Sequence, residues 1–426
     1  MRTHLFWFRN DLRLHDQLAL QSAAADGDRL LLVYVHEPAQ DALTAWGFTR
    51  MGGHRRRHLA ECLSELQDQL SRLGQTLWLL RGPVEEVLPA CAHACGASTV
   101  VCEAIEAPEE QAQVQALRQA GLTVRTVWQS SLLSPEDLPF AVADLPAVFT
   151  EFRRSVEGAG VRPRAPIPAP MELPPPPNSD VLERLAGRVD SPHALLGVPP
   201  NTPSLHRGGE RRALAHLKDY LTPPWPDRYK ATRNALQGEH TSSHWSPGLA
   251  TGALSPRRIW ADLQAYERTH GANDGTYWLW FELLWRDHFR FLHQQHGKRL
   301  YRARGLSNLP PPTHDPVRFE RWCWGQTGER IVDAGMHELA ATGFTSNRMR
   351  QIVASYLVHD LACDARAGAA WFESQLVDYD PYSNQGNWLY LSGRGTDPRQ
   401  GRRFNPQKQS QEHDPEGHYQ ARWLKG

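Results

Sequence analysis

The chain has 426 residues, of which 40% are hydrophobic and 22% charged, and its mean hydropathy is −0.55. This balance is typical of folded globular proteins and excludes disordered, fibrous and membrane-spanning chains. Apolar runs stay far below the ~20 residues that a transmembrane helix needs, and no signal-peptide core follows the first methionine. We therefore expect cytoplasmic residence and no membrane partner.

Charge and tryptophan are distributed unevenly along the chain. Residues 1–200 hold 18 Lys and Arg against 24 Asp and Glu, whereas residues 201–426 hold 29 against 23 and contain 11 of the 15 tryptophans. We therefore expect the second part to bind an anion through basic and aromatic surface. Neither disulfides nor a metal site are predicted, because the cysteines and histidines lack the spacings of such sites.

Short aliphatic runs alternate with helical patterns over the first 130 residues. The predicted strands are Thr3–Arg9, Leu30–His36, Thr76–Leu80, Ser98–Cys102 and Thr123–Trp128, and the predicted helices lie near 54–73, 84–95 and 109–119. Near-continuous apolar strands joined by amphipathic helices predict a doubly wound parallel sheet. Such sheets bind ligands at the carboxyl ends of their strands, which would place Trp7–Asp11, Val35–Glu37 and Val101–Glu103 on the rim of any pocket. A standard dinucleotide site is not expected, because no GxGxxG follows the first strand.

A proline-rich segment separates this α/β domain (1–130) from a helical one. Eight prolines between residues 163 and 177 disfavour helix and central strand, so residues 131–207 are interpreted as an interdomain linker. Residues 208–426 form the expected helical domain. Its predicted helices are Glu210–Leu221, Pro256–His270, Thr276–His296, Ile331–Ala341, Asn347–Leu361 and Ala367–Val377, followed by an irregular basic tail over Ser392–Trp423.

Two predicted helices carry candidate functional faces. The first has one face made of Glu282, Trp285, Arg286 and Phe289. A solvated Glu–Arg pair beside a packed tryptophan would give the same pattern. The second begins after Ser346, a predicted N-cap, and its positive end would attract an anion near Asn347 and Arg350.

Two other segments concentrate polar groups. Leu376–Trp388 holds acids, amides and a tryptophan in a turn-rich run after a helix, which favours ligand binding. Asx turns alone are the alternative. His240–Pro247 clusters hydroxyls before a helical segment, and it either cradles a phosphate or caps that helix.

Six motifs follow one another along nearly the whole chain: Leu5–Asp16, Phe149–Glu157, Glu282–Phe291, Gly325–Gly328, Gly343–Arg350 and Asp378–Trp388. Together they resemble the photolyase/cryptochrome family, and specifically its cryptochrome DASH branch. The resemblance implies an α/β domain joined by a long linker to an all-α domain that holds FAD in a bent form. This agrees with the organisation inferred from the residues themselves.

The resemblance also implies which residues bind FAD. Tyr229 and the hydroxyls of Ser242 and Ser243 would hold the diphosphate, and the alignment can shift by one residue to Thr241. The implied cofactor-binding set is Tyr229, Thr241, Ser242, Ser243, Trp245, Arg286, Arg350, Asp378, Asp380 and Asn384.

Four members of this set match positions around the isoalloxazine ring. Arg350 and Asp378 match an ion pair beside the ring, Asp380 an acid beneath its N3/O4 edge, and Asn384 the residue facing N5. A neutral amide opposite N5 tolerates an anionic reduced flavin, which a carboxylate would repel.

The resemblance further implies a carbon–carbon lyase of the DNA photolyase type. It would repair cyclobutane pyrimidine dimers by blue-light-driven electron transfer from reduced FAD, with ultraviolet-damaged DNA as its partner. Single-stranded DNA is expected to be preferred, because unpaired bases are easier to flip out. The implied catalytic residues are Glu282, Trp285, Asn347, Asn384 and Trp388, and the implied DNA-binding residues are Arg348, Arg394, Arg402 and Arg403. We expect a monomer.

Two other functions stay open. A blue-light sensor or regulatory flavoprotein could bind nucleic acid without repairing it. A helical flavoprotein with a dark redox role would leave the basic surface unexplained.

The chain departs from the family at its electron relay. Trp388 matches the tryptophan next to the flavin, but Ala365 and Pro312 stand where two further tryptophans are expected. The candidates for another route are Trp371, Trp322, Trp324 and Tyr390.

An antenna pigment, often a folate such as methenyltetrahydrofolate in this branch, remains open. Glu103 and Glu106 could bind a pterin at a strand end, or they could be ordinary loop acids.

Overall fold

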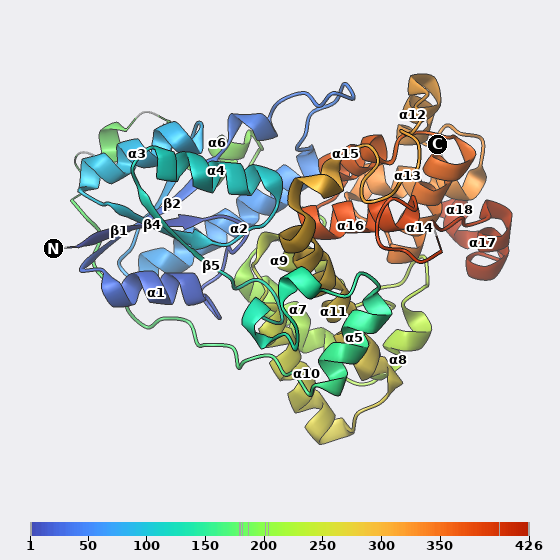
Figure 1. The fold of residues 1–426 in the computed structure, drawn as a ribbon, viewed down its shortest axis with the longest axis horizontal. Helices are drawn as coiled ribbons and strands as arrows, with labels where there is room; N and C mark the ends of the chain where they lie inside the picture. The colour runs from blue at the N-terminus through green and yellow to red at the C-terminus, as the bar shows by residue number, and fades with distance from the viewer. Residues whose placement is uncertain are drawn as a thin grey trace.

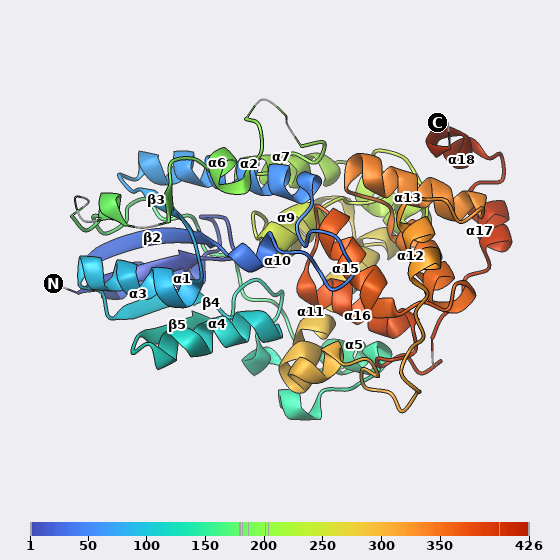
Figure 2. The ribbon, with the colours of Figure 1, turned by 90° about the horizontal axis from the view of Figure 1, so that it is seen from above.

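The structure, a computed structural model, describes residues 2–178, 180, 182–185, 187–200, 202, 204–399 and 401–424. It has two domains side by side, an α/β domain at the end that carries the amino terminus and a helical domain at the end that carries the carboxyl terminus (Figure 1, Figure 2). The expected fold class is therefore confirmed. No helix in the described part of the chain is both long and apolar enough to cross a bilayer.

The α/β domain contains one sheet with the strand order β5-β4-β1-β2-β3-β6. Its strands are β1 (Thr3–Phe8), β2 (Arg29–His36), β3 (Leu77–Arg81), β4 (Thr99–Glu103), β5 (Thr123–Val127) and β6 (Arg188–Val189). The first five are parallel, and in β1 the residue His4 pairs with Leu30 on one side and Thr99 on the other. All five predicted strands are confirmed. The two-residue β6, antiparallel to β3, is too short to leave a sequence pattern.

Helices cover both faces of this sheet. They are α1 (Leu18–Asp26), α2 (Gly53–Arg72), α3 (Val84–Cys95), α4 (Pro108–Gln119) and the short α6 (Pro192–Leu196). Phe6 and Phe8 share a hydrophobic cluster with α1 and α2, whereas Leu5 and Trp7 share another with α3 and α4. Successive strand residues therefore face opposite helix layers, as a doubly wound sheet requires. The alanine-rich α1 was not predicted, because its buried and exposed residues differ little in hydropathy.

The segment interpreted as a linker has two different parts. It first forms α5 (Phe149–Gly158), whose buried Phe149 belongs to the same hydrophobic cluster as α11 of the helical domain. Residues 161–178 then contain no helix or strand and run along the sheet, where Pro175 O accepts a hydrogen bond from the backbone of β2 (3.1 Å). The chain adds β6 and α6 to the α/β domain before it enters the helical one. The domain boundaries at residues 130 and 207 remain predictions.

The helical domain packs around two large hydrophobic clusters. Its helices are α7 (Glu210–Tyr220), α8 (Trp225–Thr232), α9 (Ser246–Thr251), α10 (Pro256–His270), α11 (Asp274–His296), α12 (Pro316–Cys323), α13 (Arg330–Thr342), α14 (Asn347–Ser355), α15 (Ala365–Gln375), α16 (Pro381–Leu391), α17 (Pro406–His413) and α18 (His418–Trp423). Short 3₁₀ helices lie at Pro38–Gln40, Pro135–Asp137, Val142–Asp144, Leu182–Arg184 and Gly297–Tyr301, and a π-helical turn, Tyr356–Asp360, extends α14. The six helices predicted for this domain are confirmed.

Two sequence predictions in the helical domain are wrong. The run Leu376–Trp388 is not a loop throughout, because it becomes α16 at Pro381. Asp380 caps this helix by accepting a hydrogen bond from Ser383 N (2.7 Å), and proline fits the first helical turn. The last stretch is not irregular either, since Asn405 caps α17 in the same way and α18 follows. Polar residues and prolines that looked like turn signals are helix starts here.

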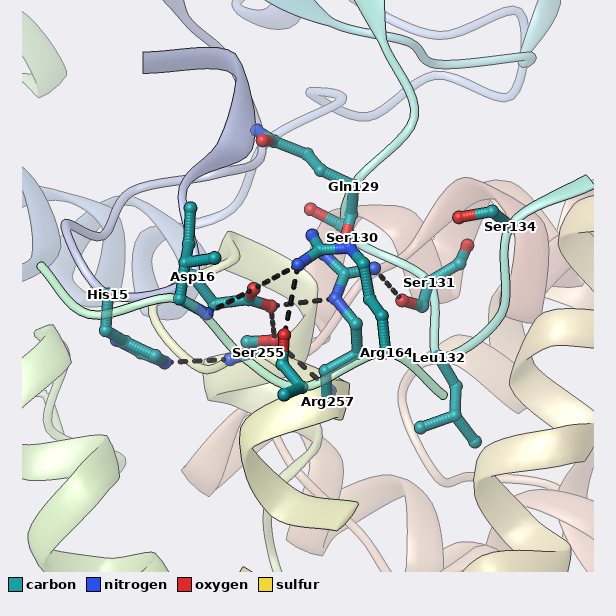
Figure 3. Close-up of polar contacts among 12 residues, drawn as sticks. His15, Asp16, Gln129, Ser130, Ser131, Leu132, Ser134, Arg164, Ser255 and Arg257 are labelled. Atoms are coloured by element: carbon teal, nitrogen blue, oxygen red, sulfur yellow. Dashed lines mark hydrogen bonds and ion pairs between the residues drawn. The ribbon is translucent and has the colours of Figure 1, made fainter. Parts of the chain in front are cut away.

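A buried ion pair joins the two domains. Asp16, at the end of the amino-terminal motif, contacts Arg257 Nε of α10 at 2.9 Å, and both side chains are fully buried (Figure 3). Ser255 Oγ donates to Asp16 Oδ2, and Arg164 Nη1 contacts Asp16 Oδ1 at 3.2 Å. Arg257 Nη1 donates in turn to Ser131 O (2.6 Å). We call Asp16, Arg164, Ser255 and Arg257 the interdomain joint.

The expected pocket rim at the carboxyl edge of the sheet is wrong at Asp11 and Glu103. Asp11 and Glu103 are 0% and 1% exposed. Asp11 Oδ1 accepts a hydrogen bond from Arg9 N (2.8 Å), and Glu103 Oε1 lies 3.8 Å from Arg290 Nη1 of α11. The helical domain covers this edge, which is open in sheets that bind ligands there.

Candidate functional site

A cavity of about 750 Å³ opens in the helical domain. Its walls include residues of α5, α8, the loop before α9, α11, the start of α14, the loop before α16, and α16 itself. This volume lies within the range of sites for cofactors and other small molecules. Segments far apart in the sequence therefore meet around one space.

Helix α11 forms one wall of the cavity. Its start is fixed by Asn273, whose Oδ1 accepts hydrogen bonds from Gly275 N (2.8 Å) and Thr276 N (3.1 Å). The four residues predicted to share one face all line the cavity: Glu282, Trp285, Arg286 and Phe289.

Glu282 is held by a cation that the sequence did not single out. Arg233, at the end of α8, contacts Glu282 Oε1 at 2.8 Å and lies 4.6 Å above the ring of Trp278. Burial raises the pKa of Glu282 above its ordinary value, and Arg233 partly opposes that shift. Arg233 follows Tyr229 by one helical turn, and this spacing was the available signal.

One face of the Trp285 ring is covered by another aromatic ring. Its ring stacks on Phe149 of α5 with the centroids 3.8 Å apart and the planes at 13°. Tyr390 meets it edge-on at 5.4 Å. Phe149 was not predicted as a cavity residue, although it stands in a motif that resembles the family. With one ring face covered by Phe149, Trp285 can offer the other to a planar ligand.

Arg286 is 9% exposed, and its guanidinium group hydrogen-bonds to two other segments of the chain. Its Nη1 donates to Ser130 O (2.6 Å), and its Nη2 donates to Leu249 O of α9 (3.2 Å). Burial lowers the pKa of Arg286 to about 10. Its two hydrogen bonds give it a structural task in addition to its place in the cavity wall.

Arg350 and Asp378, 28 residues apart in the chain, form an ion pair in the cavity wall. Arg350 Nη2 lies 2.8 Å from Asp378 Oδ2, and Arg350 Nε donates to Thr345 O (3.0 Å). Asp378 Oδ1 is buried and has no hydrogen-bond partner among the described residues. One oxygen therefore fixes the pair, and the other remains available to a ligand.

Asp380 lies beside this pair and plays two roles. One carboxylate oxygen caps α16, and the other lies 3.4 Å from Arg290 Nη2. Burial alone would raise the pKa of Asp380, but Arg290 and Arg286 lower it below its ordinary value. Arg290 was missed by the sequence reading, although it follows Arg286 by one helical turn. Asp380 is therefore a buried carboxylate that stays charged.

Asn384 and Trp388 follow on successive turns of α16 and both line the cavity. Asn384 Nδ2 donates to Ala369 O of α15 (3.0 Å), which orients the amide. Trp388 is 3% exposed. Asn347 lines the cavity from the first turn of α14, whose N-cap Ser346 accepts a hydrogen bond from Met349 N (3.2 Å) as predicted.

The loop before α9 also contributes to the cavity wall. Ser242, Ser243 and Trp245 line the cavity together with Tyr229 of α8. Thr241 does not line it, and its Oγ1 donates to Gly238 O (2.8 Å). Trp245 Nε1 is buried without a hydrogen-bond partner among the described residues, a second polar atom that a ligand could satisfy.

The four arginines predicted to bind DNA divide into two groups. Arg348 and Arg402 line the cavity, where Arg348 Nη2 donates to Asn234 Oδ1 (3.0 Å) and Arg402 Nη2 donates to Tyr390 Oη (2.6 Å). Arg394 and Arg403 do not line it. Arg394 Nη2 donates to Pro310 O (2.9 Å), and Arg403 pairs with Asp360 at 2.6 Å.

Of the two acids considered for an antenna pigment, Glu103 is engaged through its carboxylate and Glu106 through its backbone. Burial raises the pKa of Glu103, which faces Arg290 inside the domain interface. The backbone N of Glu106 donates to Tyr382 Oη of α16 (2.7 Å). Glu103 is therefore an interdomain residue and not an open loop acid.

Comparisons with known proteins agree with this geometry. The family model described as DNA photolyase matches residues 4–172, and the FAD binding domain of DNA photolyase matches residues 278–426. Cryptochrome DASH of Synechocystis sp. is 43% identical over 99% of this chain and 87% of its own length. Cryptochrome DASH of Vibrio parahaemolyticus is 41% identical over 98% of this chain and 92% of its own length.

Solved structures lead to the same family. The crystal structure of a Synechocystis sp. cryptochrome superposes with a TM-score of 0.92 at 42% identity, covering 100% of this chain and 89% of that one. A class III photolyase from Agrobacterium tumefaciens gives a TM-score of 0.82 at 30% identity, covering 99% and 86%. The chain thus belongs to the photolyase/cryptochrome family, in its cryptochrome DASH branch, and is an FAD-binding blue-light flavoprotein.

Proposed function

We propose that this protein repairs cyclobutane pyrimidine dimers in DNA under blue light, with a preference for single strands. One observation carries the proposal. Glu282, Trp285 and Asn347 line the same cavity as Arg350, Asp378, Asp380 and Asn384. A base-recognition surface and a flavin-binding surface would then share one space, as direct electron transfer between them needs.

The residues present fit FAD. The cavity has the size of a cofactor site, and the buried atoms Asp378 Oδ1 and Trp245 Nε1 offer an unused acceptor and an unused donor. Arg350, Asp378, Asp380 and Asn384 would surround the ring system, and Tyr229, Ser242 and Ser243 would bind the diphosphate. When bound in its reduced form and excited by blue light, FAD supplies the electron that splits the dimer.

The chain's own residues would bind and orient the lesion. Trp285 offers one ring face to a flipped-out base, and base–aromatic stacking contributes ~1–3 kcal/mol. The raised pKa of Glu282 suits a carboxyl group that hydrogen-bonds a base edge. Asn347 adds an amide at the positive end of α14.

Phosphates would meet the cations at the cavity wall. Arg348 and Arg402 line the cavity, and Arg233 joins them there. Such contacts bind nucleic acid of any sequence and leave recognition to the lesion. Because the cost of flipping is smallest for unpaired bases, we expect repair of single strands to be favoured.

The test uses the purified holoprotein after chemical reduction of its FAD. It is mixed with one thymine-dimer oligonucleotide, as a single strand and as a duplex, and illuminated with blue light beside a dark control. We expect light-dependent repair that is faster on the single strand. Glu282→Gln should slow repair while the FAD content stays unchanged.

An absence of repair on both substrates, with FAD bound and reduced, would refute the proposal. Retained binding of the dimer oligonucleotide in that case would favour a sensor or regulator that binds nucleic acid. Size-exclusion chromatography of the same sample tests the expected monomer, and the absorbance of released chromophores tests the folate antenna.

A further inference from the structure

A column of aromatic rings leads from the cavity wall to the protein surface. It begins at Trp388 of α16, which lines the cavity. Ala365, at the start of α15, and Pro312, in the loop before α12, stand where the resemblance led us to expect the next tryptophans. Neither side chain can carry charge by oxidation. An electron that reaches Trp388 must therefore come through the aromatic rings that contact it.

Two aromatic rings contact Trp388 within the described residues. Phe372 of α15 meets it at 5.1 Å between centroids, and Trp322 of α12 meets it edge-on at 6.3 Å. Trp322 is fully buried, and its Nε1 donates to Val353 O (2.9 Å), which fixes the orientation of the indole. Among these neighbours, Trp322 has the side chain that is easier to oxidise.

Further rings extend the column from Trp322 toward solvent. Phe319 stacks beside Trp322 at 6.0 Å and packs against Phe48, which the loop between β2 and α2 brings over from the α/β domain (6.3 Å). Phe48 meets Trp371 at 5.0 Å, and Trp371 meets Trp324 at 5.7 Å. The column is continuous, with no gap filled by an aliphatic side chain alone.

The exposure of the four tryptophans gives the column a direction. Trp388, Trp322 and Trp371 are 3%, 0% and 5% exposed, whereas Trp324 is 55% exposed. A positive charge on an indole is disfavoured in a dry, apolar cluster and is stabilised by water. A charge created at Trp388 would therefore be most stable at Trp324.

We propose that Trp388, Trp322, Trp371 and Trp324 carry electrons from solvent to the flavin site, in place of the tryptophans that this chain lacks. Under light, Trp388 would give one electron to bound oxidised FAD and be refilled from Trp322. Trp322 would be refilled from Trp371 across the intervening rings of Phe319 and Phe48, and Trp371 from Trp324. Trp324 releases its indole proton to water. An external thiol then returns one hydrogen atom to Trp324 and becomes a thiyl radical, and two such radicals combine to a disulfide. Each thiol hydrogen thus yields one electron for the cofactor and one proton for solvent.

The test needs no DNA, so its outcome is independent of the proposed repair. Oxidised holoprotein is illuminated without oxygen in the presence of dithiothreitol, and flavin reduction is followed by absorbance. We expect Trp322→Phe and Trp371→Phe to slow reduction at least about tenfold, because each removes a stepping stone. The matched control is Trp260→Phe, which changes a half-buried tryptophan of α10 outside the cavity and the column.

A second readout follows the tryptophans themselves. After illumination in air, peptide mass spectrometry should find oxygen added to Trp324 in the unmodified protein, and much less in Trp322→Phe or in the dark. FAD content and melting temperature establish that each variant is folded.

Three results would overturn the inference. Reduction of Trp322→Phe at the rate of the unmodified protein would remove Trp322 from the route. Light-dependent oxidation of Trp46 in place of Trp324 would move the exit to the other tryptophan that packs on Phe319 (6.2 Å). No photoreduction of the unmodified protein would exclude any such route.

Discussion

The interdomain joint and the flavin cavity both contain a buried aspartate paired with an arginine, and they differ in what surrounds the pair. At the joint, each oxygen of Asp16 has at least two polar partners and Arg257 is fully buried. In the cavity, one oxygen of Asp378 has no partner, and the Arg350 side chain is 23% exposed. A saturated pair is a structural connection, whereas an unsaturated pair beside a cavity is prepared for a ligand.

The same contrast separates the arginines. Arg286 and Arg290 are almost fully buried, whereas Arg348 and Arg402, which line the cavity as Arg286 does, keep partial access to solvent. Residue type alone does not distinguish these roles. Access to solvent does.

The largest effect is expected at the joint. Asp16→Asn leaves Arg257 buried without a countercharge, which should lower the free energy of unfolding by ~3–5 kcal/mol. Denaturant titration followed by circular dichroism measures this loss. An unchanged midpoint of unfolding would mean that the joint is not the structural connection we infer.

The corresponding change in the cavity should act on the ligand. Asp378→Asn removes the charge that pairs with Arg350, and we expect FAD affinity to fall about tenfold or more, which corresponds to ~1.4 kcal/mol. The apoprotein should unfold at nearly the same denaturant concentration as before. A large loss of apoprotein stability with unchanged FAD affinity would mean that Asp378, like Asp16, is a structural residue.

The interface between the domains should respond to pH through Glu103. Burial raises the pKa of Glu103 above its ordinary value of 4.5, although Arg290 partly opposes the shift. The folded state then holds a proton that the unfolded state releases, so stability falls as the pH rises from 4.5 through the raised value. Glu103→Gln should remove this decline. The stability of the variant relative to that of the unmodified protein should therefore be higher at pH 8 than at pH 5. Melting temperatures of both proteins across this range test it, and parallel curves would contradict it.

The smallest effects are expected at the arginines predicted to bind DNA. Arg348→Gln should weaken binding of single-stranded DNA. It should also reduce the slope of the logarithm of the binding constant against the logarithm of the salt concentration by about one. Arg403→Gln is the matched control, because Arg403 is 67% exposed and pairs with Asp360 away from the cavity. Fluorescence anisotropy at several salt concentrations measures both. Equal effects of the two substitutions would mean that Arg403 also belongs to the DNA-binding surface.

Much of the local structure could be predicted from the sequence because the signals are local. The alternation of apolar strands and amphipathic helices predicted the sheet, and the periodicity of Asn347–Leu361 with Ser346 before it predicted a capped helix. Where the same signals are ambiguous, prediction failed. Asp380 and Pro381 favour a turn as much as a helix start, and α16 was missed for that reason.

The candidate site could be predicted only in part from the sequence. The face of Glu282, Trp285 and Arg286 follows from helical periodicity, whereas Arg350 and Asp378 were paired through the family resemblance. Arg233 and Phe149 escaped both, because their partners on α11 are distant in the chain.

The sequence by itself determined the order and type of most secondary structure, the division into an α/β and a helical domain, and the family. Only the tertiary structure decided which polar groups are saturated, which tryptophans touch, and that the helical domain buries the carboxyl edge of the sheet. The physical reason is that periodicity and capping act within a few residues of the chain. Burial and the pairing of charges depend on segments that meet only after folding, as Asp16 meets Arg257 and Trp388 meets Trp322.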